Sequence, residues 1–113
     1  MFYMPKYHNL PDGRQVFLRF PDPVRHALPV SQLLEGIPQE EAVAQTYLTE
    51  ANAHPMRLVL VAEIAGQVAG CGLLDLDASL RQTAVAPDFQ GLDLETLIAT
   101  ALTEVAAQKG VTL

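Results

Sequence analysis

The chain has 113 residues, half of them apolar, and a net charge of −6. This length suits one domain with a buried core and excludes two such domains. The seven lysines and arginines are scattered from Lys6 to Lys109, and a surface that binds nucleic acid needs clustered cations, so we expect no nucleic-acid partner.

The sequence also indicates where the protein functions. It contains no stretch of 18 uncharged apolar residues, so we expect no membrane span. Residues 1–10 lack the long apolar run of a signal peptide. Cys71 is the single cysteine and lies in an apolar run, which predicts a buried, inert thiol and no internal disulfide. These features predict a cytoplasmic protein.

The N-terminal part predicts an arm and a strand. Residues 1–13 are expected to form an arm or loop that ends in the turn Pro11-Asp12-Gly13. From Arg14 to Phe20 apolar and polar residues alternate, which is typical of a strand with one buried face.

Two helices are expected next. Asp22-Pro23 has the pattern of a helix N-cap followed by proline, and predicts a helix to about Glu35 that is kinked or restarted at Pro29. Its expected apolar side is Val24, Ala27 and Leu28.

A second helix should begin at Pro38, with Glu40 and Glu41 in its first turn, and end at Asn52 and Pro55. Its expected apolar stripe is Val43, Ala44, Tyr47, Leu48 and Ala51.

The middle of the chain predicts a hairpin and a third strand. Residues 56–65 and 68–76 are rich in strand-forming residues and flank the tight turn Gly66-Gln67. After a turn at residues 77–79, a strand from Leu80 to Ala86 is expected to stop at Pro87.

The C-terminal part predicts a helix with one continuous apolar stripe, and after it the start of another strand. Lys109 and Gly110 suit the end of the helix, and Val111 to Leu113 begin the strand. The order β-α-α-β-β-β-α-β predicts a single α+β domain over residues 1–113, with a mostly antiparallel sheet flanked by helices. The stripe consists of Leu94, Leu97, Ile98, Ala101, Leu102, Val105 and Ala106.

One segment has the pattern of a binding site, namely residues 80–96 with the sequence LRQTAVAPDFQGLDLET. A strand that leads through a tight loop into a helix N-terminus presents free backbone N–H groups and the positive end of the helix dipole to an anion. The same geometry is also that of an ordinary strand-to-helix crossover.

The residues of this stretch resemble motif A of the GNAT superfamily of N-acetyltransferases, in which Val-x-Pro is followed by Gln/Arg-Gly-x-Gly-x-Gly/Ala. Val85, Pro87 and the pair Gln90-Gly91 fit this pattern, and Arg81 to Val85 resembles strand four of the family. The hairpin with Gly66, Gly70 and Gly72 resembles strands two and three, and Asp12 to Arg19 resembles the opening strand of some members.

The resemblance implies a cofactor, a reaction and a set of site residues. The cofactor would be acetyl-CoA, and the reaction the transfer of its acetyl group to an amine. Backbone groups of Thr83 and Val85 would bind the pantetheine arm and the thioester carbonyl. The pyrophosphate would lie against Gln90, Gly91, Asp93, Leu94, Glu95 and Thr96.

Asp93 and Glu95 depart from the pattern, which has glycine or alanine at both positions. Side chains here crowd the phosphates, and two like charges about 4 Å apart near a protein surface repel by about 4 kcal/mol. The same acids also suit the helix end, with Asp93 as N-cap and Glu95 in the first turn. Retained cofactor binding and a helix capped by the protein's own carboxylates are both consistent with the sequence.

The sequence also differs from the family in length. The family domain continues through strand five, a further helix and two strands, which often supply a tyrosine as general acid, whereas this chain stops after the first residues of strand five. An uncovered sheet edge would be exposed, so we expect a homodimer, or exchanged elements, to cover it. The open interpretations are an acetyltransferase, an enzyme completed across a dimer, a non-catalytic dimerisation or regulatory module, and a fragment of a longer chain.

Other polar residues carry weaker hypotheses. His8, His26 and His54 have no partner at ligand spacing, so no metal site is expected. Asp75 and Asp77 flank a strand end and are interpreted as turn residues, with a general base for the acceptor amine as the alternative. The catalytic residues are not identified by the sequence.

Overall fold

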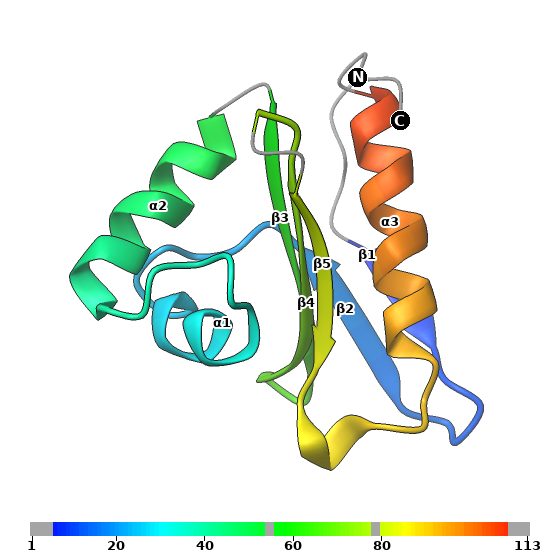
Figure 1. The fold of residues 1–113 in the computed structure, drawn as a ribbon. Coiled ribbons are helices and arrows are strands. Elements are labelled where there is room, and N and C mark those ends of the chain that lie inside the picture. The colour runs from blue at the N-terminus through cyan, green and yellow to red at the C-terminus, as the bar shows by residue number, and fades with distance from the viewer. Residues whose placement is uncertain (1–5, 54–55, 78–79, 109–113) are drawn as a thin grey trace.

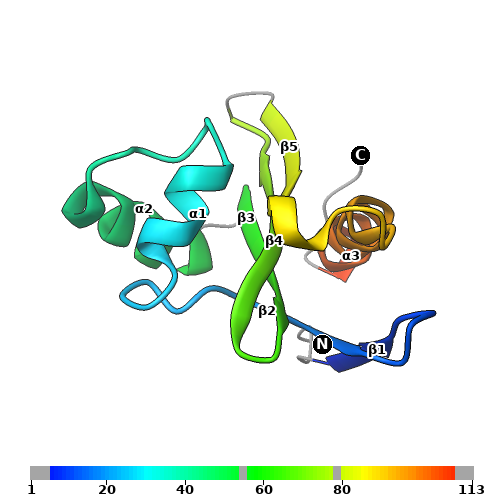
Figure 2. The same ribbon diagram turned by 90° about the horizontal axis from the view of Figure 1, so that it is seen from below.

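The computed structural model describes residues 6–53, 56–77 and 80–108. Five antiparallel strands form one sheet in chain order, β1-β2-β3-β4-β5. Helices α1 and α2 cover one face of this sheet and α3 covers the other (Figures 1 and 2). The α+β architecture predicted from the sequence is confirmed. The strands are β1 (Lys6–Asn9), β2 (Gln15–Arg19), β3 (Arg57–Ile64), β4 (Gln67–Asp75) and β5 (Leu80–Val85), and the helices are α1 (Ala27–Leu33), α2 (Glu41–Ala53) and α3 (Leu94–Gln108).

The N-terminal segment is more ordered than the sequence suggested. It was expected to be an arm or loop, but its residues Lys6–Asn9 form β1, which pairs with β2 in the register Tyr7↔Phe17. The two rings stack with their centroids 4.6 Å apart. Only four residues form this strand, too few for alternation to reveal it, so the pairing with β2 defines it.

Helix α1 is shorter than predicted. It begins at Ala27, while the Asp22 carboxylate accepts hydrogen bonds from the N–H groups of Val24 and Arg25 in a separate turn before it. Val24 and Leu28 are therefore exposed, contrary to the expected apolar side. Pro29 is the third helical residue, where a backbone N–H has no partner within the helix, so it neither kinks nor restarts α1.

Helix α2 packs on the sheet through Ala44, Leu48 and Ala51, as the apolar stripe predicted. Val43 is exposed, so the buried stripe is narrower than expected. The turn between β3 and β4 consists of Ala65 and Gly66, both with positive φ, one residue earlier than predicted. This backbone is typical of a two-residue hairpin turn.

Helix α3 lies unusually close to the centre of β4. A Cβ added at Gly72 would meet Ile98 Cγ2 at 2.6 Å and Leu102 Cδ1 at 2.8 Å. The glycine thus gives the helix the room to seat its apolar stripe, whose buried members are those predicted except for the partly buried Leu97. The predicted helix end at Lys109 and Gly110 and the strand from Val111 lie outside the described residues.

No helix in the described part of the chain is long and apolar enough to cross a bilayer. Cys71 is fully buried between the sheet and the α1–α2 layer, and burial raises the pKa of its thiol to about 12. The thiol is therefore protonated and inert at neutral pH, as predicted.

Candidate functional site

The segment from β5 to α3 folds as the sequence predicted. The strand ends at Val85, and Pro87 opens a single turn of 3₁₀-helix, Pro87–Phe89, before the loop that enters α3 at Leu94. Gly91 has a φ of 85°, which glycine adopts without strain. The predicted junction of a sheet strand with a helix N-terminus is therefore present.

A pocket of about 320 Å³ lies at this junction. Seven of the eight residues predicted from the family motif line it, together with Phe89, which the sequence analysis missed because the motif leaves its position unspecified. Thr83 does not reach this pocket and lines a separate hollow beside the α1–α2 connection. The seven are Val85, Gln90, Gly91, Asp93, Leu94, Glu95 and Thr96.

Two carboxylates therefore border the helix N-terminus. Asp93 occupies the position before α3, and its carbonyl accepts the N–H of Leu97 at 3.2 Å. Its φ of 58° is left-handed, whereas N-cap residues are normally extended. Glu95 lies in the first turn, where the helix dipole favours negative charge. Within the described residues neither acid forms an ion pair.

The β1–β2 hairpin lies beside the same loop. A second crevice of about 310 Å³ runs between residues 8–12, which are the end of β1 and the start of the turn, and the loop from Gly91 to Asp93. Arg14 follows that turn, and its guanidinium carbon lies 5.9 Å from the centre of the Phe89 ring. One oxygen of the Asp12 carboxylate, Oδ2, lies 2.7 Å from both Nε and Nη2 of this guanidinium. These segments are distant in the sequence, and no local pattern links them, because they meet only where α3 crosses the face of the sheet.

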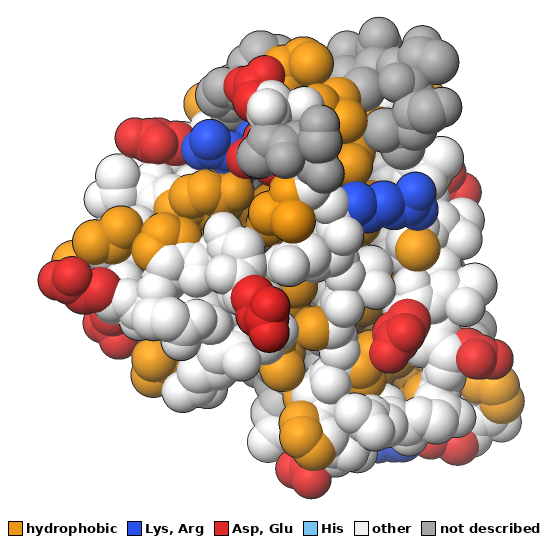
Figure 3. Space-filling view, in the orientation of Figure 1, with side chains coloured by type: hydrophobic (Ala, Val, Ile, Leu, Met, Phe, Trp, Pro, Cys, Tyr) orange, Lys and Arg blue, Asp and Glu red, His pale blue; other side chains and the backbone are white. Residues whose placement is uncertain are grey.

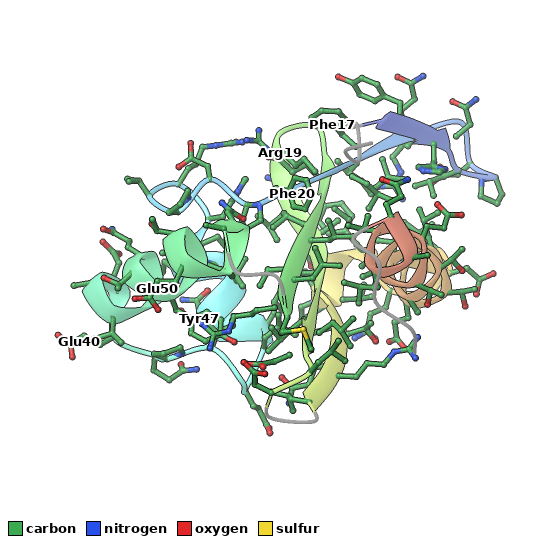
Figure 4. The ribbon with its side chains drawn as sticks, turned by 90° about the horizontal axis from the view of Figure 1, so that it is seen from above. Phe17, Arg19, Phe20, Glu40, Tyr47 and Glu50 are labelled. Atoms are coloured by element: carbon green, nitrogen blue, oxygen red, sulfur yellow. The ribbon has the colours of Figure 1, made fainter. Side chains whose placement is uncertain are left out.

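A buried acid lies at the other end of the sheet. Asp75 was expected to be a turn residue, but it is the last residue of β4 and only 5% exposed. Asp77 does lie in the turn. The Asp75 carboxylate accepts a hydrogen bond from Arg57 Nε at 3.1 Å, and Tyr47 donates to it at 3.5 Å. Tyr47 projects from α2 on the same side as Glu50 (Figure 4), and burial raises its pKa. This cluster ties α2 to the sheet.

A second buried ionic cluster surrounds Glu63 on β3. Arg25 binds both its oxygens, at 3.0 and 3.3 Å, and Arg19 of β2, labelled in Figure 4, lies 3.6 Å away. His26 is buried, with Nδ1 accepting the N–H of Asp22 and Nε2 3.4 Å from Glu63. Burial opposes the ionisation of Glu63, but Arg25 and His26 outweigh it and lower its pKa. In the portion of the chain described, no three His, Cys, Asp or Glu side chains are grouped to hold a metal ion.

Comparisons with known proteins identify the fold. No protein-family model matches the chain, and no curated protein matches it significantly. Among solved structures it is similar to yncA from Salmonella typhimurium, ascribed to the acetyltransferases and determined with its cofactor acetyl-CoA. The two share a TM-score of 0.63 and 19% identity, over 85% of this chain and 65% of that chain. This likeness confirms a GNAT-like fold, and this chain spans about two-thirds of that protein's length.

Proposed function

We propose that this chain is a GNAT-like domain that binds acetyl-CoA at the junction of β5 and α3 and belongs to an N-acetyltransferase acting on an amine. One observation carries the proposal: seven residues chosen from the sequence motif line one pocket at a helix N-terminus. Free N–H groups and the helix dipole there suit a pyrophosphate. The structure with which it shares its fold holds acetyl-CoA.

The acids in the loop support a second candidate, a non-catalytic module that binds CoA weakly or not at all. Asp93 and Glu95 line the pocket that the pyrophosphate would enter. Repulsion worth even half of the 4 kcal/mol expected for like charges about 4 Å apart would weaken binding roughly thirtyfold. The protein's own carboxylates would then occupy the helix end in place of phosphate.

Calorimetric titration with acetyl-CoA separates the two candidates. The wild type is compared with Asp93→Gly/Glu95→Ala, which restores the small residues of the motif. Glycine also suits the left-handed backbone of Asp93, and alanine keeps the helix, so the variant should fold. Binding by the wild type supports the acetyltransferase domain. Binding by the double variant alone supports the non-catalytic module, and binding by neither refutes a CoA site.

We further propose that a second copy of the chain covers the outer edge of β5. This strand is at the edge of the sheet, and apolar side chains run down the middle of the face that it borders (Figure 3). Open strand edges with apolar surroundings are typical sites of association. Light scattering coupled to gel filtration should give the mass of a dimer, and a monomer mass would refute this arrangement.

We also propose that the protein functions in the cytoplasm, whose reducing conditions suit the protonated thiol of Cys71.

A further inference from the structure

We propose that Arg14 is a phosphate-binding residue of the pocket at the start of α3, supplied by the β1–β2 hairpin. This inference rests on the proposed cofactor site. No residue of the motif provides a cation there, because the pocket is lined by two acids and otherwise by uncharged side chains. A positive charge from another part of the molecule would offset these two acids and add to the attraction of the helix N-terminus for an anion.

Arg14 lines a neighbouring hollow of the β1–β2 hairpin, and its contact with Phe89 places its charge at the border of the pocket. Phe89 lines the pocket, and the Arg14 guanidinium lies over its ring at 5.9 Å. A guanidinium over an aromatic ring keeps its N–H groups free at its edges while the ring fixes its position. Residues 8–12 of the hairpin and residues 91–93 of the loop border the same crevice, so the hairpin lies beside the loop.

The ion pair between Arg14 and Asp12 is weak enough for a ligand to replace Asp12. Asp12 binds the guanidinium, but both side chains are well exposed, at 39% and 47% of their full areas. Ion pairs this exposed contribute little to stability. Asp12 offers the guanidinium a single oxygen, Oδ2, whereas a phosphate offers two or more oxygens and a larger charge. Binding of the cofactor would therefore move Arg14 from Asp12 to the phosphate without disturbing the fold.

The test is calorimetric titration of acetyl-CoA into the wild type, Arg14→Gln, Asp12→Asn and the double variant, at low and high salt. We expect Arg14→Gln to weaken binding about fivefold at low salt, with a smaller difference at high salt, as for a charge-assisted contact at a solvent-exposed rim. Asp12→Asn should tighten binding, because it frees Arg14. The double variant should match Arg14→Gln, since Asp12 acts only through Arg14.

Arg25→Gln is the matched control, because it makes the same change in net charge in a half-exposed arginine that binds Glu63 instead. Equal affinities of the wild type and Arg14→Gln would overturn the inference and leave the proposed function standing. Equal weakening by Arg14→Gln and Arg25→Gln would also overturn it, since overall charge would then explain the effect. A wild type that does not bind acetyl-CoA would refute the proposed function, and this inference with it.

Discussion

The two faces of the sheet are built by different means. Every buried polar or charged residue identified in the described part of the chain, namely His26, Ser31, Glu63 and Asp75, lies on the face covered by α1 and α2. The face under α3 is apolar, and the glycines of β4 let the helix approach closely. Both faces therefore have an apolar core, and the α1–α2 face adds buried ion pairs to it.

This difference bears on function. On the α1–α2 face the acids are buried and paired, so they are committed to holding the layers together. On the α3 face the acids Asp93 and Glu95 lie outside the core, at the mouth of the pocket. Both are exposed, so their replacement should change ligand binding and leave the apolar packing of the helix intact.

The largest change in the free energy of unfolding should come from substitutions on the sheet face under α3. Ile98→Ala removes the side chain that fills the space over Gly70 and Gly72, and buried Ile→Ala substitutions cost about 2–5 kcal/mol of unfolding free energy. Gly72→Ala alone should destabilise through the clash with Ile98 and Leu102, by about 1–3 kcal/mol. In the Ile98→Ala background the same change should cost less, because one of its two clashing neighbours is gone.

Urea unfolding followed by circular dichroism measures all three variants. Strict additivity of the two substitutions would contradict the close approach of α3 to β4, since residues in contact should couple.

The next largest change in the free energy of unfolding should come from the ionic face, which is the sheet face covered by α1 and α2 with its buried ion pairs. Asp75→Ala leaves Arg57, whose side chain is only 20% exposed, without its hydrogen-bond acceptor on β4, and should destabilise by about 1–3 kcal/mol. Replacing both residues by leucine should cost less than Asp75→Ala, because no buried charge is then left unpaired. The same urea experiment compares them. A double variant less stable than the single one would show that the charges themselves are needed on this face.

The ionic face was also the harder one to predict from the sequence. The stripe of α3 and the alternating strands specify their packing locally, and seven residues that the motif from Val85 to Thr96 singles out line one pocket. The pairing of Arg25 with Glu63 depends on how the turn before α1 lies against β3. That of Arg57 with Asp75 depends on the register of the β3–β4 hairpin, which shifts between Ala62 and Glu63. No local pattern records that, and for the same reason the contact between Arg14 and Phe89 was missed.

The start of α1 was wrong for a related reason. Asp22-Pro23 has the residues of a helix N-cap, and Asp22 does cap backbone N–H groups. It caps a turn, however, because His26 accepts the Asp22 N–H and is drawn into the core beside Glu63, so the helix begins only at Ala27. Tertiary contacts thus shifted an end that local sequence had placed four residues earlier.

A smaller loss of stability is expected from alanine substitutions at two glycines, and a comparison of the two tests whether the loop at Gly91 binds the cofactor. Gly91 and Gly66 both have positive φ, and in both places an added Cβ would meet open space. Either glycine replaced by alanine should therefore cost only the strain of the left-handed backbone, about 1–2 kcal/mol. Gly91→Ala should also weaken acetyl-CoA binding, because the backbone near the phosphates carries a new side chain, whereas Gly66→Ala should leave binding unchanged. Equal binding by both variants would place the cofactor away from the Gly91 loop.

The smallest effect should be a change in the pH dependence of stability that arises from His26. Burial lowers the pKa of His26 below its ordinary 6.5, although Glu63 opposes the shift. The unfolded chain then binds the proton more readily than the folded one, so stability is fully present above pH 6.5 and falls as the pH drops below it. Glu63, with a pKa below its ordinary 4.5, adds a second loss of the same sign below pH 4.5.

His26→Asn separates these two losses. The asparagine oxygen replaces Nδ1 as the acceptor of the Asp22 N–H, so the turn before α1 should persist, while the ionisable ring is gone. Urea midpoints measured between pH 7.5 and 5 should decline for the wild type and stay nearly level for the variant, and both should decline below pH 4.5. Parallel curves above pH 5 would mean that His26 takes up its proton equally well folded and unfolded, and the buried ionic cluster would then not be what makes the α1–α2 face sensitive to acid.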